Sequence, residues 1–362
     1  MIMKNFNLFV AAIAFLFAIG CEKVDTKPES LTSAGDRCSL RVQFAGAGTG
    51  TRVTGQAPEN ESRIQNVQVF VFRTDQDDVL DASASEGFDS GLDFDASSAA
   101  YGALTLDCTA GQREIWAVVN AGSDHTSDGS VKNKADLLAM TSLLSENSAS
   151  KLFMTGSKPA SLASGTSSVT VEVKRACASV VLKGISNMMV SPAHQSSGSF
   201  RLKDVYLMNV PAKINYGMDT DYKDSEDWYA RMSKETDGAK SALILDESEP
   251  KVLDYGETDN TQHTFYSYPN SCAPSHEPSW SPRATVLVVE AEFSVDGTWH
   301  ECYYPITLHN GTGLERNKQY SVKLTINRPG SDSPNDPVAF GTLSGMVEVA
   351  DWETGDSYTE TI

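Results

Sequence analysis

Short runs of β-branched and aromatic residues recur along almost the whole chain, and clusters of Gly, Ser, Asp and Pro separate them. Many strand-length runs bounded by turn residues are typical of β-sandwiches and barrels. The clearest runs are residues 38–44, 64–72, 113–120, 168–173, 178–182, 205–210, 284–293, 303–308, 319–326 and 343–352. The sequence therefore predicts a mainly β protein, and its 362 residues suffice for two β-sandwich domains.

Residues 134–144 depart from this pattern because their apolar side chains recur at helical spacings, at Leu137, Leu138, Met140 and Leu144. We expect one short helix here, packed against the N-terminal sandwich. A Ser- and Gly-rich turn precedes Lys174 and Arg175, after which the strand pattern restarts, so a domain boundary is predicted at this point. The domains expected are 53–173 and 174–362, with the acidic stretch 219–248 running over the surface.

The sequence of the N-terminus indicates that the chain is exported from the cytoplasm. Residues 1–20 combine a basic start with an apolar run too short to span a bilayer, which is typical of a signal peptide. The run ends in Ala18-Ile19-Gly20-Cys21, which resembles the lipobox of bacterial lipoproteins, where Cys21 would carry the lipid. The alternative is an ordinary secretory signal with an incidental cysteine. A lipid on Cys21 would tether the exported chain to a membrane.

The first strand-like run is followed by a loop of unusual composition. Leu40, Val42 and Phe44 alternate with polar residues, as in a strand with one buried face. The chain then continues as AGAGTGTRVTG, in which Arg52 is the only charged residue. A glycine-rich backbone without periodicity is a favourable site for proteolysis. Other basic positions lie before the first strand or beside the second, at Lys27, Arg63 and Arg73.

Charge and cysteine content exclude several classes of protein. The net charge of −19 makes nucleic acid and anionic membrane surfaces unfavourable partners. Of the six cysteines, five remain if Cys21 is acylated, and none forms a CxxC motif. This pattern does not indicate a disulfide scaffold, and we expect isolated buried cysteines that act as small apolar residues.

No motif predicts catalysis, a cofactor or a metal site. The GAGTG sequence lacks the glycine spacing and the following helix of a phosphate-binding loop, and the six histidines have no ligand spacing. The acidic residues at 219–227 could ligate calcium, but Lys223 occupies a ligand position of an EF-hand loop, so a solvated loop is favoured. Aromatic residues that could stack on sugars, but are more often core, are Phe265, Tyr266, Tyr268, Trp280, Trp299, Tyr303 and Tyr304.

Several stretches together resemble the FimA-type fimbrillins, the structural subunits of type V pili of Gram-negative bacteria. They run in order from Cys21 through the Arg52 loop, ESRIQNVQVFVF, CTAGQREIWAVVNAG, the 134–144 segment, KRACASVVLKGI, LERNKQYSVKLTINRPGSDSPNDPV and VEVADW. The resemblance covers almost the whole chain and is loosest over residues 186–300. It implies two transthyretin-like sandwiches and a structural role without enzymatic activity.

The resemblance also implies how such a chain assembles. The precursor would reach the outer membrane as a lipoprotein, and an Arg/Lys-specific protease would cut between Arg52 and Val53. Residues 21–52 would then leave as a lipidated propeptide, taking with them the first strand and its apolar residues Leu40, Val42 and Phe44. A donor strand from residues 343–362 of another subunit would replace it, with Val347, Val349, Trp352 and Ile362 as its inserting side chains.

Physical chemistry supports this mechanism independently. Removing a strand from a sandwich exposes an apolar groove and unpaired backbone groups, which accept an added strand by β-augmentation. A head-to-tail contact of this kind does not close and therefore produces a filament. The function implied is that of a shaft subunit of a cell-surface fimbrium that supports adhesion or biofilm formation, with tip and anchor fimbrial proteins as partners. The alternative is a monomeric cell-surface lipoprotein that binds glycan or a host protein.

Overall fold

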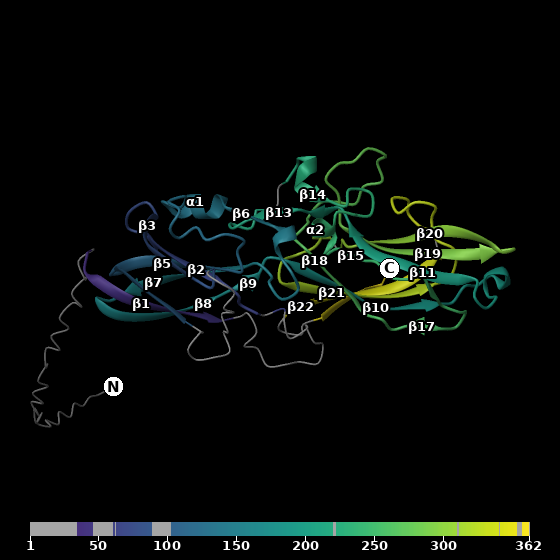
Figure 1. The fold of residues 1–362 in the computed structure, drawn as a ribbon, viewed down its shortest axis with the longest axis horizontal. Coiled ribbons are helices and arrows are strands. Elements are labelled where there is room, and N and C mark those ends of the chain that lie inside the picture. The colour runs from purple at the N-terminus through teal and green to yellow at the C-terminus, as the bar shows by residue number, and fades with distance from the viewer. Residues whose placement is uncertain are drawn as a thin grey trace, which may run out of the picture.

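The computed structural model describes residues 35–45, 61, 63–88, 103–219, 222–309, 311–339, 341–352 and 357–361. The molecule is elongated, with the earlier strands at one end and the later strands at the other (Figure 1). The predicted signal peptide, Cys21, Arg52, Val53 and Ile362 lie outside the described residues. Within the described ranges, none of the helices has the length and apolar character needed to cross a membrane.

The N-terminal half is a sandwich of two sheets. Its strands are β1 (Arg37–Ala45), β2 (Val67–Arg73), β3 (Val79–Glu86), β4 (Ala103–Thr109), β5 (Gly111–Val119), β7 (Met154–Leu162), β8 (Gly165–Glu172) and β9 (Lys174–Arg175). One sheet has the order β4-β1-β8 and the other has the order β3-β2-β5-β7-β9. Leu40 and Val42 of the first sheet share one hydrophobic cluster with Val69 and Ile115 of the second.

The second strand is buried on both faces. Val67, Val69 and Val71 of β2 belong to the core of the N-terminal sandwich. Phe70 and Phe72 point to the opposite side and belong to a second cluster that continues into the C-terminal half. The two halves of the molecule therefore share a continuous hydrophobic core behind β2.

The C-terminal half is also built from two sheets. Its main strands are β10 (Ala178–Asn187), β11 (Phe200–Met208), β15 (Leu245–Asp246), β16 (Lys251–Val252), β17 (Thr258–Asp259), β18 (His263–Ser267), β19 (Val286–Val295), β20 (Thr298–Thr307), β21 (Lys318–Ile326), β22 (Leu343–Asp351) and β23 (Ser357–Thr361). One sheet has the order β17-β10-β21-β22-β23, with β18 also on β10, and the other has the order β15-β11-β19-β20, with β16 also on β11. Val180 and Val322 of the first sheet pack in one cluster with Val289 and Tyr304 of the second.

The helix in this region is shorter than the sequence predicted for residues 134–144. The helix α1 spans Lys134–Ala139 and begins with a capping box formed by Asn133 and Asp136. The chain then becomes extended, because β6 (Thr141–Leu143) pairs with β13 (Lys213–Asn215) of the other half, and a 3₁₀ turn, η1 (Leu144–Glu146), follows. Pairing with a distant strand therefore overrides the local helical spacing of the leucines.

The sequence suggested that the acidic stretch 219–248 runs over the surface. In the structure, part of this stretch is ordered into short elements and packs into the core. Its described part contains η3 (Ser225–Asp227), β14 (Trp228–Tyr229) and α2 (Gly238–Ser241), and β14 pairs with β12 (Val210–Pro211). Trp228, Tyr229 and Ile244 are buried. The apolar residues are too widely spaced for a periodic pattern, yet they anchor the segment to the core. A third 3₁₀ turn, η2 (Pro192–His194), precedes β11.

Candidate functional site: the first strand and the C-terminal segment

The predicted displaced strand, β1, is the central strand of its sheet. It is antiparallel to β4 from Arg37, opposite Thr109, to Gln43, opposite Ala103. On its other edge it is parallel to β8, from Cys38 beside Gly165 to Ala45 beside Glu172. Loss of β1 would therefore leave unpaired backbone groups on two strands at once, which is costly unless another strand takes its place.

The side chains of β1 alternate between the core and solvent, as predicted. Cys38, Leu40 and Val42 are buried, and Phe44 is half-buried against the same cluster. Arg41 points outward and is exposed. Burial of each large apolar side chain contributes roughly 1.5–3 kcal/mol, so removal of the strand opens an apolar groove that is strongly unfavourable in water.

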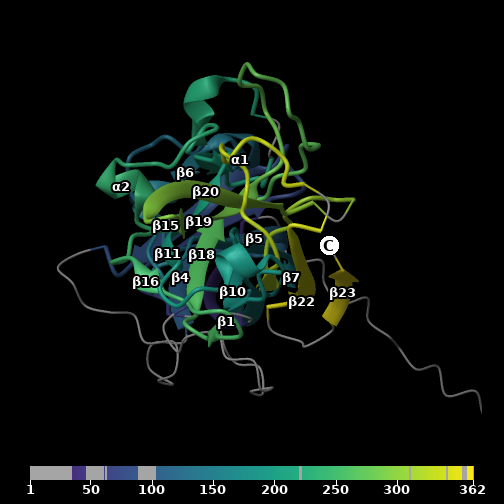
Figure 2. The same ribbon diagram turned by 90° about the vertical axis from the view of Figure 1, so that its right-hand side faces the viewer.

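The predicted donor strand, β22, is paired within its own chain. It is antiparallel to β21 from Leu343, opposite Ile326, to Asp351, opposite Lys318. The last described strand, β23, pairs with β22 and forms the outer edge of this sheet (Figure 2). Along β22 only Val347 is buried, whereas Leu343 and Val349 are half-buried. The strand is thus extended and hydrogen-bonded, but contributes less side-chain burial than β1.

Trp352, immediately after β22, is held by residues from three distant segments. Its indole Nε1 donates a 2.9 Å hydrogen bond to Oε2 of Glu61, and the hydroxyl of Tyr266 donates to the other carboxylate oxygen. The Tyr266 ring stacks on the Trp352 ring with centroids 6.0 Å apart, and the guanidinium of Arg175 lies 4.5 Å from the centroid of the Trp352 ring. We call Glu61, Arg175, Tyr266 and Trp352 the Trp352 clamp.

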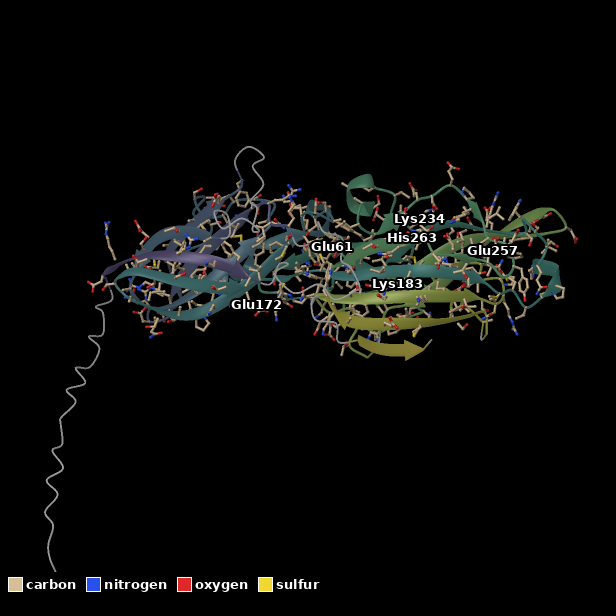
Figure 3. All side chains as sticks on the ribbon, turned by 90° about the horizontal axis from the view of Figure 1, so that it is seen from below. Glu61, Glu172, Lys183, Lys234, Glu257 and His263 are labelled. Atoms are coloured by element: carbon tan, nitrogen blue, oxygen red, sulfur yellow. The ribbon has the colours of Figure 1, made fainter. Side chains whose placement is uncertain are left out.

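The Trp352 clamp connects the start of the N-terminal sandwich to the end of the C-terminal sheet. Arg175 Nε donates a 3.1 Å hydrogen bond to the backbone oxygen of Glu61, and the backbone nitrogen of Trp352 donates to the oxygen of Asn317. Figure 3 shows Glu61 where the two halves meet. The segment that follows the Arg52 loop is thereby in direct contact with the segment predicted to donate a strand.

Comparison with known proteins shows which proteins the chain resembles. Residues 38–187 match the family model described as the major fimbrial subunit protein FimA. The major fimbrium subunit FimA type-2 of Porphyromonas gingivalis is 24% identical over 405 residues, covering 97% of this chain and 98% of that protein. The chain is similar to FimA fimbrial subunits. That family consists of structural subunits and is not an enzyme family.

Solved structures share the fold of this chain. A putative cell adhesion protein from Bacteroides eggerthii superposes with a TM-score of 0.64 at 19% identity, covering 88% of this chain and 97% of that one. A fimbrilin from Porphyromonas gingivalis W83 superposes with a TM-score of 0.59 at 14% identity, covering 89% and 99%. The predicted mainly β fold and the recognised resemblance are confirmed.

Burial raises the pKa of Glu61 in the Trp352 clamp. Removal from water raises the pKa of this carboxyl above 4.5, although hydrogen bonds from Tyr266 and Trp352 and the charge of Arg175 oppose the shift. The folded state therefore binds a proton at Glu61 more tightly than the unfolded state does. Its contribution to stability is greatest below about pH 4.5 and decreases as the pH rises through the folded-state pKa.

A pair of substitutions at Glu61 tests the clamp. Glu61→Ala leaves the buried indole N–H of Trp352 without an acceptor and should lower the free energy of unfolding by about 1–3 kcal/mol. Glu61→Gln keeps a carbonyl acceptor and removes the charge, so it should be at least as stable as wild type at about pH 7 and similar to it at about pH 4. Urea unfolding at both pH values measures this. Equal losses for Ala and Gln would contradict the clamp.

The sequence predicted isolated cysteines, but two of them lie next to each other in the structure. Cys38 of β1 lies directly opposite Cys108 of β4, and both are buried in the same cluster. Burial, together with the neighbouring Cys38 and Asp81, raises the pKa of the Cys108 thiol to about 12. Cys177 and Cys302 are buried in the other cluster, and Cys272 is half-buried. Sequence spacing gave no sign of the pair because strand register brings the two cysteines together.

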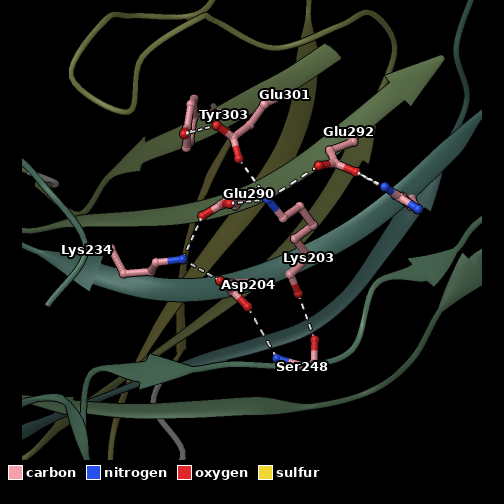
Figure 4. Close-up of polar contacts among 9 residues, drawn as sticks. Lys203, Asp204, Lys234, Ser248, Glu290, Glu292, Glu301 and Tyr303 are labelled. Carbon is pink, nitrogen blue, oxygen red and sulfur yellow. Dashed lines mark hydrogen bonds and ion pairs between the residues drawn. The ribbon is translucent and has the colours of Figure 1, made fainter. Parts of the chain in front are cut away.

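Acidic side chains on the outer face of β11, β19 and β20 are held by two lysines (Figure 4). Lys203 Nζ lies 2.9 Å from Glu290 and 2.8 Å from Glu301, and Lys234 Nζ contacts Glu290 and Asp204. The hydrogen bond from Lys203 lowers the pKa of Glu301 to about 2. Across the described ranges there is no group of three or more residues arranged to hold a metal ion.

The acidic segment 219–227 is only partly described, because Thr220 and Asp221 lie outside the described residues. Asp227 pairs with Lys213 at 2.6 Å, so its carboxylate already has a cationic partner. The structure gives no support to calcium binding at this segment among the residues described.

Most of the aromatic side chains that could stack on sugars are core residues. Phe265, Tyr266, Tyr268 and Tyr304 are buried. Trp299, on the β19–β20 hairpin, is 38% exposed, but the guanidinium of Arg201 lies 4.1 Å from its ring centroid. Among the described residues, the geometry therefore offers little support for a glycan-binding aromatic platform.

Proposed function

We propose that the chain is the precursor of a fimbrial shaft subunit that polymerises by donor-strand exchange after proteolysis releases β1. The observation that carries the proposal is the position of β1, a central strand with a buried apolar face that is encoded immediately before the Arg52 loop. A cut between Arg52 and Val53 separates this strand covalently from everything that follows. The vacated groove then accepts the C-terminal segment of another subunit.

The proposal divides the chain by role. Residues 1–20 are the signal peptide, and residues 21–52 are a propeptide lipidated at Cys21. Residues 53–173 and 174–362 form the N-terminal and C-terminal domains, and residues 343–362 donate the strand. The precursor is an outer-membrane lipoprotein, and the mature subunit resides in a cell-surface fimbrium that supports adhesion or biofilm formation.

The two strands that exchange have matching patterns. Every second residue of β1 faces the core, giving the series Cys38, Leu40, Val42 and Phe44. In β22 the corresponding alternate residues are Leu343, Gly345, Val347 and Val349. Apart from Gly345, which has no side chain, both series place apolar side chains at two-residue spacing, which is what an acceptor groove with one buried face requires. Donation also requires β22 to leave β21 and Trp352 to leave its clamp.

Assembly of this kind uses two different surfaces of each subunit. The groove between β4 and β8 accepts a strand, and the C-terminal segment donates one. A heterologous contact adds subunits in one direction without closing, so the product is a fibre. An Arg/Lys-specific protease, tip and anchor fimbrial proteins and the outer membrane complete the set of partners that the proposal requires.

Limited proteolysis tests the proposal directly. The purified precursor is treated with a low dose of trypsin in the presence of reductant and examined by N-terminal sequencing and by SDS gel electrophoresis without boiling. We expect a product that begins at Val53 and forms SDS-resistant ladders. A product that begins at Val53 and stays monomeric would refute donor-strand exchange as its function.

Leu40→Ala should destabilise the precursor and have no effect on the mature subunit. Leu40 is fully buried in β1, so its truncation is expected to cost the precursor about 2–5 kcal/mol of unfolding free energy. After cleavage and loss of β1 the variant and wild type have the same sequence and the same stability. Urea unfolding before and after trimming measures both values. Arg41→Ala, on the exposed face of β1, is the matched control, with a change within about 0.5 kcal/mol.

A further inference from the structure

The buried cysteine pair in the N-terminal sandwich crosses the proposed boundary between propeptide and mature subunit. Cys38 is 1% exposed and lies in β1, before the Arg52 loop, whereas Cys108 is 7% exposed and lies in β4, after it. The two residues are direct partners in the antiparallel register. Directly opposed residues in an antiparallel pair place both side chains on the same face of the sheet.

The spacing of such a pair suits a disulfide. Opposed residues in antiparallel strands have Cα atoms about 4.5–5.5 Å apart, and disulfides join Cα atoms about 4.4–6.8 Å apart. Cys38 is also close enough to Cys108 to contribute to the raised pKa of the Cys108 thiol. No movement of β1 against β4 is therefore needed to join them.

We propose that Cys38 and Cys108 form a disulfide that links β1 covalently to β4. The reaction is an exchange with a disulfide oxidant, such as a thiol–disulfide oxidoreductase in its oxidised form. The two cysteine thiols lose two protons and two electrons and gain one S–S bond. The oxidant's S–S bond breaks, and its two sulfurs take up the electrons and protons as thiols.

The environment of the pair determines when this exchange occurs. The thiolate is the attacking species, and the burial that raises the pKa of the Cys108 thiol to about 12 keeps that thiol protonated once the sandwich has formed. Oxidation is therefore fast while β1 is still exposed during folding and slow afterwards. By the same reasoning, small reductants reach the finished bond slowly because both sulfurs lie in the core.

The disulfide itself does not depend on the proposed function, but its consequence does. If Arg52 is cut while the bond is intact, β1 remains attached to the mature subunit through Cys108. The acceptor groove stays filled, so polymerisation requires reduction as well as proteolysis. The pair then acts as a second control on strand release.

Peptide mapping tests the bond. The full-length chain is refolded in a mixture of reduced and oxidised glutathione, its free thiols are blocked with iodoacetamide in denaturant, and it is digested with trypsin without reductant. Cleavage at the basic residues that flank each cysteine gives peptides 38–41 and 74–113. We expect these two peptides as one linked species that disappears on reduction. Cys38→Ser should abolish the species, and Cys272→Ser, at a half-buried cysteine elsewhere, should retain it.

The results separate the two proposals. Quantitative alkylation of both cysteines, with no linked peptide, would overturn the disulfide. If the linked species is present, intact mass after cleavage at Arg52 should include the propeptide until reductant is added, and loss of the propeptide without reductant would overturn its retention. A linked species together with monomers after cleavage and reduction would support the bond and refute polymerisation. Cys108→Ser provides a second variant that leaves β1 unaltered.

Discussion

Replacement of Arg52 by alanine should abolish fibres and leave a stable, monomeric precursor. Without a basic residue in the glycine-rich loop, an Arg-specific protease has no site there, and β1 stays covalently joined to the subunit. The strand then occupies the groove between β4 and β8 at an effective concentration that no donor strand from another molecule can match. Electron microscopy of the cell surface should show fibres for wild type and essentially none for Arg52→Ala.

Two matched variants make this result specific. Arg52→Lys retains a trypsin-type cleavage site and should retain fibres when the protease accepts lysine. Arg63→Ala removes the next arginine along the chain, which lies beside the second strand, and should leave cleavage at Val53 unchanged. Fibres of normal length from Arg52→Ala would show that strand release at this loop is not required.

Deletion of residues 343–362 should convert a subunit into a chain terminator. Such a subunit keeps the acceptor groove of the N-terminal sandwich but has no strand to donate. It can therefore join a growing fibre by one surface only, and mixing about one truncated subunit into ten should shorten fibres to about ten subunits. Electron microscopy at several mixing ratios measures how the mean fibre length depends on the fraction of truncated subunits.

The control for this experiment is the same truncation combined with Arg52→Ala. That subunit has neither an open groove nor a donor strand, so it should not alter fibre length at any ratio. A shorter truncation after Trp352 removes β23 and preserves the pairing of β22 with β21, which protects the fold of the C-terminal half. Truncated subunits that are folded by circular dichroism and yet polymerise alone would contradict the assignment of the donor.

The sequence predicted a strand correctly where burial alternates regularly, or is continuous, along that strand. The alternation of β1 and the apolar run of β2 follow from which faces are buried, and both appear in the sequence. The strand β3 was missed because all but its terminal residues are half-buried, so no periodicity marks it. The helix α1 was overestimated because the pairing of β6 with β13 depends on a segment far along the chain.

Some residues of the candidate site could be identified from the sequence and others only from the folded structure. The sequence identified Leu40, Val42 and Trp352 as candidates because apolar residues in strands must be covered. It did not identify Glu61 or Arg175, whose importance comes from contact with Trp352 across the molecule. A charged residue buried beside a tryptophan has no local sequence signal. Only the folded chain shows that the segment after the Arg52 loop and the C-terminal segment meet.

The mixed neighbours of β1 have a consequence for the direction of the fibre. Because β1 is antiparallel to β4 and parallel to β8, any strand placed between them has one neighbour of each kind, whichever way it runs. Backbone hydrogen bonds therefore do not select an orientation for the incoming strand. The choice falls to the order of its side chains, where a glycine at one position and valines at two others must meet the right parts of the groove. The polarity of the whole filament would then be encoded by a few residues of β22.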